Sequence, residues 1–305
     1  MSLYSSVFAG TIPYKLYIEN GEAFCHWLNT MGKKFDEPFF DETILSCRAL
    51  PGNARRVKCI SPVAMLPEWS AGMNTIRPTA FIFHLSRCGS TLVSQLLTQD
   101  PANIVLSEVP FFDELLRLHL QLPGITTDMG DAWLASAMKF YGQKRNAAEE
   151  RLFIKADCWH IFFYERLRKL YPDVPLVVLY RSPDEVLRSQ QKKRGMQAVP
   201  GIIEPEVMGI NKEEIPYHDF DQYFCMVMEK ILLQFNLVVE NDRQVLPVNY
   251  NEGILTVVKK IATHTNLTIS DELLQTMEER SRYHAKFPGE AFTGDAPPEV
   301  QPAYL

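Results

Sequence analysis

The sequence lacks the marks of several protein classes. It has no run of about 18 apolar residues, so it offers no candidate membrane-spanning helix. Its first residues show no basic segment followed by an apolar one, and export is therefore not expected. Basic residues are outnumbered, with 31 Lys and Arg against 37 Asp and Glu, a net charge of −6. The surface as a whole is not expected to attract nucleic acid or an anionic membrane, so an anionic ligand needs a locally basic pocket.

Cysteine and histidine are also sparse. The 6 cysteines among 305 residues are widely spaced and form no C-x-x-C pair. This pattern predicts reduced thiols in a cytoplasmic protein rather than a disulfide framework or a zinc site. The 7 histidines show no metal-ligand spacing and no carboxylate cluster stands out. We therefore expect no bound metal.

What the chain does contain is an alternation of short apolar runs with helical patterns from Thr79 onward. Strands are expected at 79–86, 104–107, 152–154, 175–180 and 245–250. Helices are expected at 90–99, 110–122, 131–149, 159–171, 183–194 and 221–239, from an Asn251 cap to His264, and from a Ser270 cap to about Arg282. Apolar strands alternating with helices are typical of a parallel sheet covered on both sides. The predicted fold class is α/β, with a three-layer domain at 76–305 and a small irregular or partly helical N-terminal cap at 1–75.

Ligands of such sheets bind at the carboxyl ends of the strands. The first of these ends is the turn His84-Leu85-Ser86-Arg87-Cys88-Gly89-Ser90-Thr91, which joins a strand to a helix. Backbone N–H groups and the helix dipole favour an anion at such a junction. Gly89 allows a close turn, Ser90 and Thr91 add hydroxyls, and Arg87 adds a guanidinium. The alternative is an ordinary capped helix start.

This turn differs from the phosphate-binding loop of nucleotide hydrolases, which reads G-x-x-x-x-G-K-[ST]. Aligned on Gly89, the chain has His84 in place of the first glycine and Ser90 in place of the lysine. Because that lysine reaches the β- and γ-phosphates, an ordinary ATPase or GTPase is disfavoured.

A second basic position follows the most apolar strand. Arg181 comes directly after 175–180, and Ser189 lies eight residues later (189 − 181), about two turns into the next helix. An arginine at a strand end and a serine on the adjoining helix can share one phosphate. Alternatively, Arg181 caps the helix or forms a salt bridge, and Ser189 lies on a solvated face.

Together, Ser86-Arg87-Cys88-Gly89-Ser90-Thr91-Leu92 and the segment from Arg181 to Ser189 resemble the sulfotransferase family. The resemblance is closest to the branch that includes the protein-tyrosine sulfotransferases and bacterial relatives. It implies a P-loop-type fold and a bound co-substrate, 3′-phosphoadenosine 5′-phosphosulfate (PAPS). The residues implied to bind PAPS are Arg87, Cys88, Gly89, Ser90, Thr91, Arg181 and Ser189. Ser86 and Cys88 depart from the family's usual Pro and Ser, and Cys88 is either inert packing or a redox-sensitive thiol.

Sulfuryl transfer needs a base, donors for developing charge, and substrates held in line. Arg87 fits the donor role. Glu108, which ends the second strand 21 residues after Arg87 (108 − 87), matches the glutamate that the resembling branch uses as base. Alternatively it caps the next helix or forms an ion pair. Lys155, at the end of the third strand, matches a family lysine that polarises the sulfuryl group or the leaving phosphate, or else it pairs with a carboxylate. Asp157 is the runner-up base.

Three further segments carry weaker signals. Lys192-Lys193-Arg194 is expected to be a solvated helix end, and Arg282 and Lys286 lie where the family supplies further nucleotide contacts. Residues 195–218 are rich in Gly and Pro and form either a lid over the acceptor or a disordered excursion.

The function predicted is metal-independent, in-line transfer of a sulfuryl group from PAPS to a hydroxyl or amine of a small-molecule or peptide acceptor. The alternatives are an atypical P-loop kinase or NTPase, and a non-catalytic nucleotide-binding protein of the same fold. The oligomeric state is not predicted.

Overall fold

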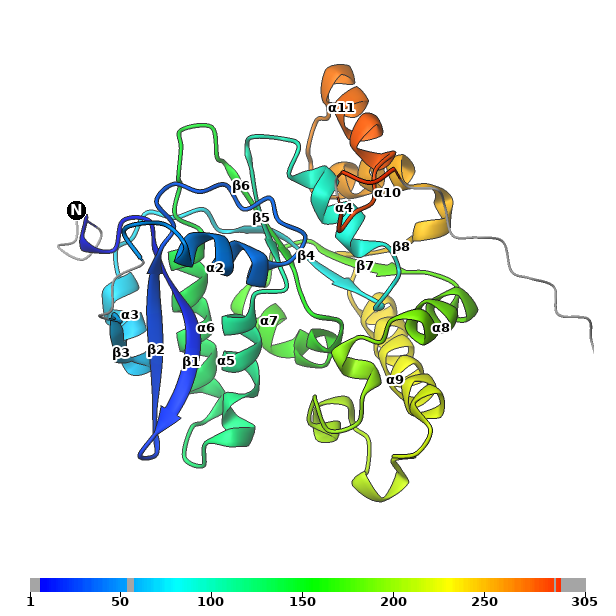
Figure 1. Cartoon of the computed structure of the whole chain (residues 1–305), viewed down its shortest axis with the longest axis horizontal. Coiled ribbons are helices and arrows are strands. Elements are labelled where there is room, and N and C mark those ends of the chain that lie inside the picture. The colour runs from blue at the N-terminus through cyan, green and yellow to red at the C-terminus, as the bar shows by residue number, and fades with distance from the viewer. Residues whose placement is uncertain (1–5, 54–57, 288, 292–305) are drawn as a thin grey trace, which may run out of the picture.

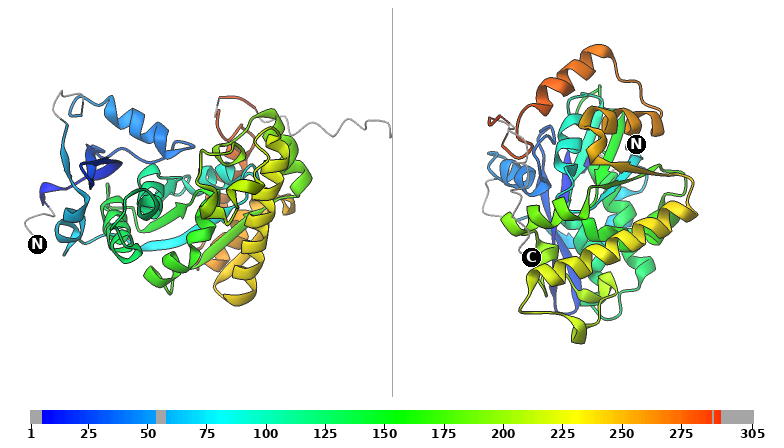
Figure 2. Two further views of the ribbon diagram at one scale, coloured as in Figure 1. Left: turned by 90° about the horizontal axis from the view of Figure 1, so that it is seen from below. Right: turned by 90° about the vertical axis from the view of Figure 1, so that its right-hand side faces the viewer.

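The computed structural model describes residues 6–53, 58–287 and 289–291. Figure 1 and Figure 2 show a central sheet with helices on both sides and a smaller sheet at the N-terminal end. Within these residues, no helix combines the length and the apolar character that crossing a bilayer requires.

The central sheet is parallel throughout. In the described residues its five strands run in the order β5-β6-β4-β7-β8. The bounds are β4 Pro78–His84, β5 Asn103–Ser107, β6 Arg151–Lys155, β7 Leu176–Tyr180 and β8 Val245–Asn249. Each strand begins and ends within two residues of the predicted run. The predicted fold class, α/β with a mainly parallel central sheet, is confirmed.

Helices cover both faces of this sheet (Figure 1). Above it lie α4 (Ser90–Leu97), α10 (Ile254–His264) and α11 (Asp271–Ser281), packed through a small apolar cluster of Leu92, Leu96, Val258 and Met277. Below it lie α5 (Pro110–Gln121), α6 (Thr127–Tyr141), α7 (Tyr164–Leu170) and α9 (Phe220–Asn241), while α8 (Pro183–Lys192) follows β7. The loops that follow the carboxyl ends of the strands therefore connect the sheet to the helices on its two faces.

Some predicted helix bounds were wrong. The helix predicted at 131–149 is α6, which spans Thr127–Tyr141. It begins earlier because Thr126 caps it, its side chain accepting from the Met129 N–H at 3.3 Å, and it ends at Tyr141 rather than at 149. The helix predicted at 159–171 divides into a 3-10 segment, η2 (Cys158–Phe163), and α7. Asn251 does not cap α10: Asn249 caps a 3-10 turn, η6 (Tyr250–Glu252), and Gly253 precedes α10.

The N-terminal region is not irregular, and that part of the prediction was wrong. Strands β1 (Thr11–Glu19), β2 (Glu22–Asn29) and β3 (Ile60–Pro62) form an antiparallel sheet. Asn20 (φ 51°) and Gly21 (φ 78°) form the two-residue turn between β1 and β2. Asn-Gly between two β-rich runs is the strongest short-range hairpin signal, so the sequence did carry the information.

This small sheet is fastened to the main domain. β1 packs on α5 and α6, and the Leu16 N–H donates to Glu114 Oε2 at 2.6 Å. Tyr141, on α6, donates its hydroxyl to the Pro13 carbonyl at 2.5 Å. One hydrophobic core contains residues of both regions. Between β2 and β3, α2 (Phe40–Arg48) brings residues 39–42 toward the carboxyl ends of β5 and β6, where they contact the groups described below.

The segment 195–218 contains three short 3-10 helices, η3 (Met196–Ala198), η4 (Pro205–Met208) and η5 (Lys212–Glu214). It is attached to α5, because Arg117 pairs with Glu204 and Gln121 Nε2 donates to Glu204 Oε1 at 3.1 Å. The segment therefore packs against the domain rather than leaving it as a loose excursion.

Candidate active site

The turn after β4 has the geometry of an anion cradle. Gly89 is the residue before α4 and adopts a left-handed conformation, φ 86°. The first N–H groups of a helix have no acceptor within the helix, so this end of α4 favours an anion. Arg87 also has a positive φ of 64°, which is costly for a residue with a side chain. Strain of this kind is concentrated at functional sites.

Gly89 is required by space as well as by conformation. A Cβ added there would lie 2.2 Å from the ring of Tyr250, the residue that follows β8. The Arg181 guanidinium, at the end of β7, lies 5.5 Å from the centroid of the same ring. Tyr250 therefore links the first turn to the second basic position. Sequence reasoning did not select it, although it too follows the carboxyl end of a strand.

A direct hydrogen bond joins the two predicted motifs. Arg87 Nε donates to Ser189 Oγ at 3.0 Å, across 102 residues of sequence. Arg181 pairs with Glu185 on α8 at 2.8 Å, and Glu185 Oε2 accepts from Asn251 Nδ2 at 2.7 Å. The predicted phosphate-binding residues of both motifs thus lie in one site rather than in two separate hollows.

Cys88 contributes its backbone to this turn. Its side chain is fully buried, burial raises the pKa of its thiol to about 12, and Sγ donates to the Leu179 carbonyl at 3.5 Å. A thiol with so high a pKa is hardly ionised near neutrality and reacts slowly. The inert-packing interpretation of Cys88 fits this environment, and the redox-sensor interpretation does not.

Glu108, Lys155 and His84 meet at the ends of three adjacent strands. Lys155 is completely buried and forms an ion pair with Glu108. The side chain of Glu108 is 22% exposed, and its backbone has a positive φ of 57°. Its N–H donates to the Lys155 carbonyl at 2.8 Å. His84 Nε2 lies 3.3 Å from Glu108 Oε1, and sequence reasoning gave His84 no role.

The electrostatics of this group favour an ionised carboxylate. Burial alone would raise the pKa of Glu108, but attraction to Lys155 and the contact with His84 outweigh it and lower the pKa. Glu108 is thus able to accept a proton but is weakly basic while it remains paired with Lys155.

Asp157 has a different role from the one expected of a base. It is buried and precedes η2 as the N-cap, with its side chain accepting from the backbone of His160. Burial, and to a smaller extent the charges of Glu108 and Asp113, raise the pKa of Asp157 well above its ordinary value. Asp157 is buried and already caps η2, whereas Glu108 is partly exposed, so the geometry favours Glu108 as the base.

Asp113, on α5, belongs to a second acidic cluster. It accepts from Trp159 Nε1 at 2.6 Å, from His160 Nε2 at 3.0 Å and from Arg117 Nε at 3.0 Å. Asp113, Asp157 and His160 could approach one metal ion, since their ligand atoms lie within 4.8 Å of one another. Both oxygens of Asp113 already accept hydrogen bonds from these three side chains, however, and one of the three is the Arg117 cation. The cluster is built as a hydrogen-bond network.

Lys286 reaches the site, whereas Arg282 does not. The Lys286 amine lies 4.9 Å from the ring centroid of Phe39, and Lys155 lies 5.6 Å from the same centroid. Burial and the nearby Arg87 cation lower the pKa of Lys286 to about 8. Arg282 is exposed and pairs with Glu278 at 3.2 Å. Lys192, Lys193 and Arg194 are exposed, as expected of a solvated helix end.

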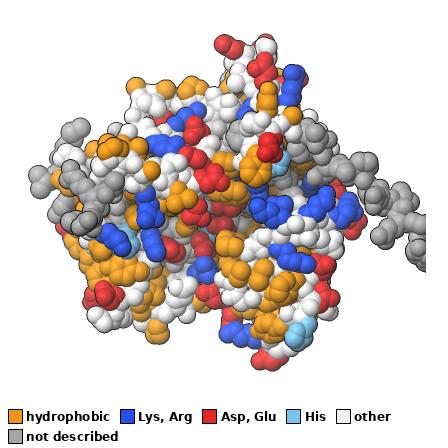
Figure 3. Space-filling view, viewed as in Figure 1, with side chains coloured by type: hydrophobic (Ala, Val, Ile, Leu, Met, Phe, Trp, Pro, Cys, Tyr) orange, Lys and Arg blue, Asp and Glu red, His pale blue; other side chains and the backbone are white. Residues whose placement is uncertain are grey.

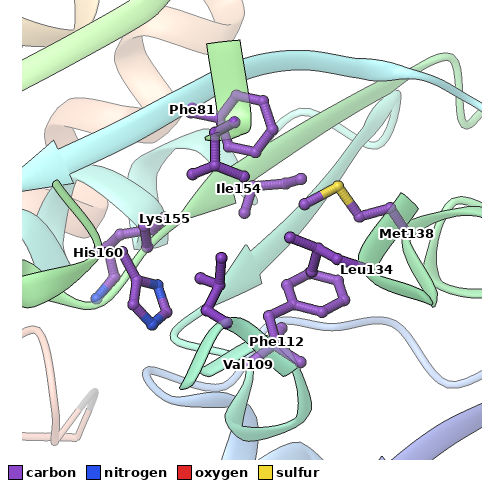
Figure 4. Close-up of a pocket in the computed structure, with 11 residues that line it drawn as sticks. Phe81, Val109, Phe112, Leu134, Met138, Ile154, Lys155 and His160 are labelled. Atoms are coloured by element: carbon purple, nitrogen blue, oxygen red, sulfur yellow. The ribbon is translucent and has the colours of Figure 1, made fainter. Parts of the chain in front are cut away.

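Figure 3 shows a hollow near the centre of one face of the molecule, in which acidic and basic side chains gather, with Lys and Arg along one side. An internal cavity of about 10 Å³ is lined by Lys155, His160 and otherwise apolar side chains (Figure 4). It is close to the smallest space that holds one water, so it does not accommodate a substrate.

Comparison with known proteins gives a fold likeness. No protein-family model matches the chain, and no curated protein matches it. The solved structures that it resembles include several sulfotransferases. They include STF1 from Mycobacterium tuberculosis, with 18% identity over 70% of this chain and 73% of that one and a TM-score of 0.43. STF9 from Mycobacterium avium has 16% identity over 69% of each chain and a TM-score of 0.45.

Mouse sulfotransferase SULT7A1, solved in complex with PAP, is also similar, with 10% identity over 76% of this chain and 77% of that one and a TM-score of 0.40. These are structures of the family that the two motifs resemble. The values are low, so the function assigned below rests on the site itself.

Proposed function

We propose that this protein is a PAPS-dependent sulfotransferase that transfers a sulfuryl group to a hydroxyl or amine acceptor without a metal. The observation that carries the proposal is the hydrogen bond between Arg87 and Ser189, which joins the two anion-binding motifs beside Glu108 and Lys155. A ligand with phosphates at both ends of a nucleoside matches two such motifs in one site. PAPS has this form.

The residues present fit the donor. The backbone N–H groups at the start of α4 would bind the phosphosulfate. Gly89 lets the Tyr250 ring pack against this turn, because any Cβ there would meet the ring. Arg181 and Ser189 would hold the 3′-phosphate. Arg87 and the hydroxyls of Ser90 and Thr91 would face the charge that develops on the bridging oxygen.

Glu108 is the proposed base. It takes the proton of the acceptor hydroxyl as the acceptor oxygen bonds to sulfur and the bond from sulfur to the phosphate oxygen breaks, its electron pair staying on the phosphate. Lys155 is placed to neutralise that phosphate oxygen. When its ammonium turns from Glu108 to the donor, the pKa of Glu108 rises toward the ordinary range, so the base becomes effective once the donor is bound.

Calorimetric titration with 3′-phosphoadenosine 5′-phosphate (PAP) tests the donor site. We expect micromolar binding to the wild type and much weaker binding of AMP, which lacks the 3′-phosphate. Arg181→Ala and Ser189→Ala each remove a donor to a charged oxygen and should weaken PAP binding by about 10- to 100-fold.

Arg282→Ala is a matched control, because its guanidinium pairs with Glu278 outside the site. Equal affinity for PAP and AMP would contradict the proposal. Turnover of ATP with Mg²⁺ in place of PAP binding would favour the P-loop kinase or NTPase instead.

A further inference from the structure

His84 is a buried polar residue in the middle of the sheet. It ends β4, which lies between β6 and β7, and it is 5% exposed. Nearly all buried polar groups in proteins have a hydrogen-bond partner. Within the described residues, however, His84 Nε2 makes no well-aligned hydrogen bond. An orphaned nitrogen beside the proposed base calls for a physical explanation.

Each ring nitrogen of His84 faces an oxygen atom that can only accept a hydrogen bond. One is a backbone carbonyl oxygen and the other is an oxygen of an ionised carboxylate. Nδ1 lies 3.3 Å from the Leu85 carbonyl oxygen, and Nε2 lies 3.3 Å from Glu108 Oε1. A neutral imidazole carries one N–H and can satisfy one of them, whereas an imidazolium satisfies both. A neutral His84 therefore donates either to Leu85 or to Glu108, and its tautomer decides which.

The charged groups around His84 explain why its ring is neutral at rest. Burial lowers the pKa of His84, the Lys155 cation lowers it further, and the Glu108 carboxylate opposes both. Around Glu108 itself lie Lys155 and His84, the acids Asp41 from α2 and Asp157 after β6, and Lys286 from the C-terminal segment. Lys155 is the nearest cation to both partners, and it is the group proposed to turn toward the donor.

We propose that His84 is a positioning residue for Glu108: its Nε2–H donates to Oε1 and holds the carboxylate at the acceptor site, so that Oε2 takes the proton of the acceptor. The inference rests on the proposed function. The proton leaves the acceptor oxygen and bonds to Oε2 of Glu108, while Nε2–H of His84 continues to donate to Oε1. No further reactant is needed.

The tautomer of His84 is the first test and needs no turnover. In protein labelled with ¹⁵N-histidine, long-range ¹H–¹⁵N spectra identify which ring nitrogen carries the proton, and His84→Gln assigns the signal. We expect a neutral ring at pH 7 with its proton on Nε2, and a changed signal in Glu108→Gln. A proton on Nδ1 alone would overturn the proposal, because Nε2 would then have nothing to donate to Glu108.

The second test separates positioning from structure. His84→Leu should lower kcat at least tenfold, part of the 10²- to 10⁴-fold that a general base contributes, with unchanged PAP affinity. His84→Gln, whose side-chain N–H can replace Nε2–H, should recover most of that loss. The acid limb of the pH profile should shift in the leucine variant and not in the glutamine variant. PAP release from PAPS, with 4-nitrophenol as the probe acceptor, provides the signal.

The control is His119→Leu, because His119 on α5 also has an unpartnered buried nitrogen but lies outside the site. Wild-type kinetics in His84→Leu would overturn the role of His84 while leaving the sulfotransferase proposal intact. Absence of PAP binding by the wild type would overturn the sulfotransferase proposal itself, and the tautomer would still report on His84.

Discussion

Glu108, which is partly buried, and Asp113, which is buried, are two acids five residues apart with opposite kinds of surroundings. Asp113 accepts from three donors on both of its oxygens, including Arg117 Nε at 3.0 Å to each. In the part of the chain that the structure describes, the side-chain contacts of Glu108 all go to Oε1, and its backbone is in a strained conformation. The comparison teaches that a fully satisfied carboxylate stabilises the fold, while one left partly unsatisfied at a strained position is suited to chemistry.

The sharpest way to break this comparison is Glu108→Gln. It removes the proposed base but keeps the shape of the side chain, and we expect kcat to fall by about 10²- to 10⁴-fold. PAP affinity, measured by calorimetry, should be retained, because the nucleotide is held by the other motif residues. Near-normal turnover in this variant would show that Glu108 is not the base.

Asp113→Ala should instead damage stability. The change leaves His160 and Trp159 without their acceptor and takes one of two carboxylates from Arg117. We expect a loss of about 3 kcal/mol of unfolding free energy, the low end for a broken buried pair because Arg117 keeps Glu204. Urea denaturation measures it. An unfolding free energy equal to that of the wild type would show that Asp113 does not stabilise the fold.

A third acid, Glu114, extends the comparison to pH dependence. Burial, with a smaller contribution from Asp113, raises its pKa from the ordinary 4.5 to about 7. The folded state therefore holds a proton that the unfolded state has already lost, and stability falls as pH rises from about 4.5 to about 7. Thermal melts of the wild type over this range should show the decline, and Glu114→Gln should flatten it.

The smallest effect is expected from Asp157→Asn. Burial disfavours the charged form of Asp157 and raises its pKa well above its ordinary value, and an uncharged amide of the same shape can still accept from the η2 backbone. Turnover and stability should each change by less than about 1 kcal/mol. A loss as large as that of Glu108→Gln would reverse the assignment of the two residues.

The sequence predicted well what is local and apolar. The buried strands β4 and β7 stand out as continuous apolar runs, and the rule that ligands bind at strand ends then selected Arg87, Glu108, Lys155 and Arg181. It did not predict the partners of these residues, because the contacts of His84 and Tyr250 depend on which strands become neighbours. The order β6-β4-β7-β8 is set by packing across the whole sheet, which no short motif encodes.

The N-terminal hairpin was missed for another reason. Asn20-Gly21 predicts a tight turn, but β1 and β2 contain Pro13, Lys15 and His26 among their apolar positions, and this blurs the alternation that marks a strand. A bulge between Pro13 and Lys15 interrupts the period of two directly. At a bulge the alternation of buried and exposed residues shifts by one position, so the strand is hard to recognise from the sequence even where the turn signal is clear.

The hydrogen bond from Arg87 to Ser189 has a consequence for how the two ends of a nucleotide affect one another. An anion that orders Ser189 also fixes the Arg87 guanidinium, and the reverse holds by thermodynamic reciprocity. Adenosine 3′-phosphate and inorganic sulfate, added as separate fragments, should therefore each bind more tightly in the presence of the other. A whole donor molecule, which carries both anions, would therefore bind more tightly than the separate affinities of the two fragments imply.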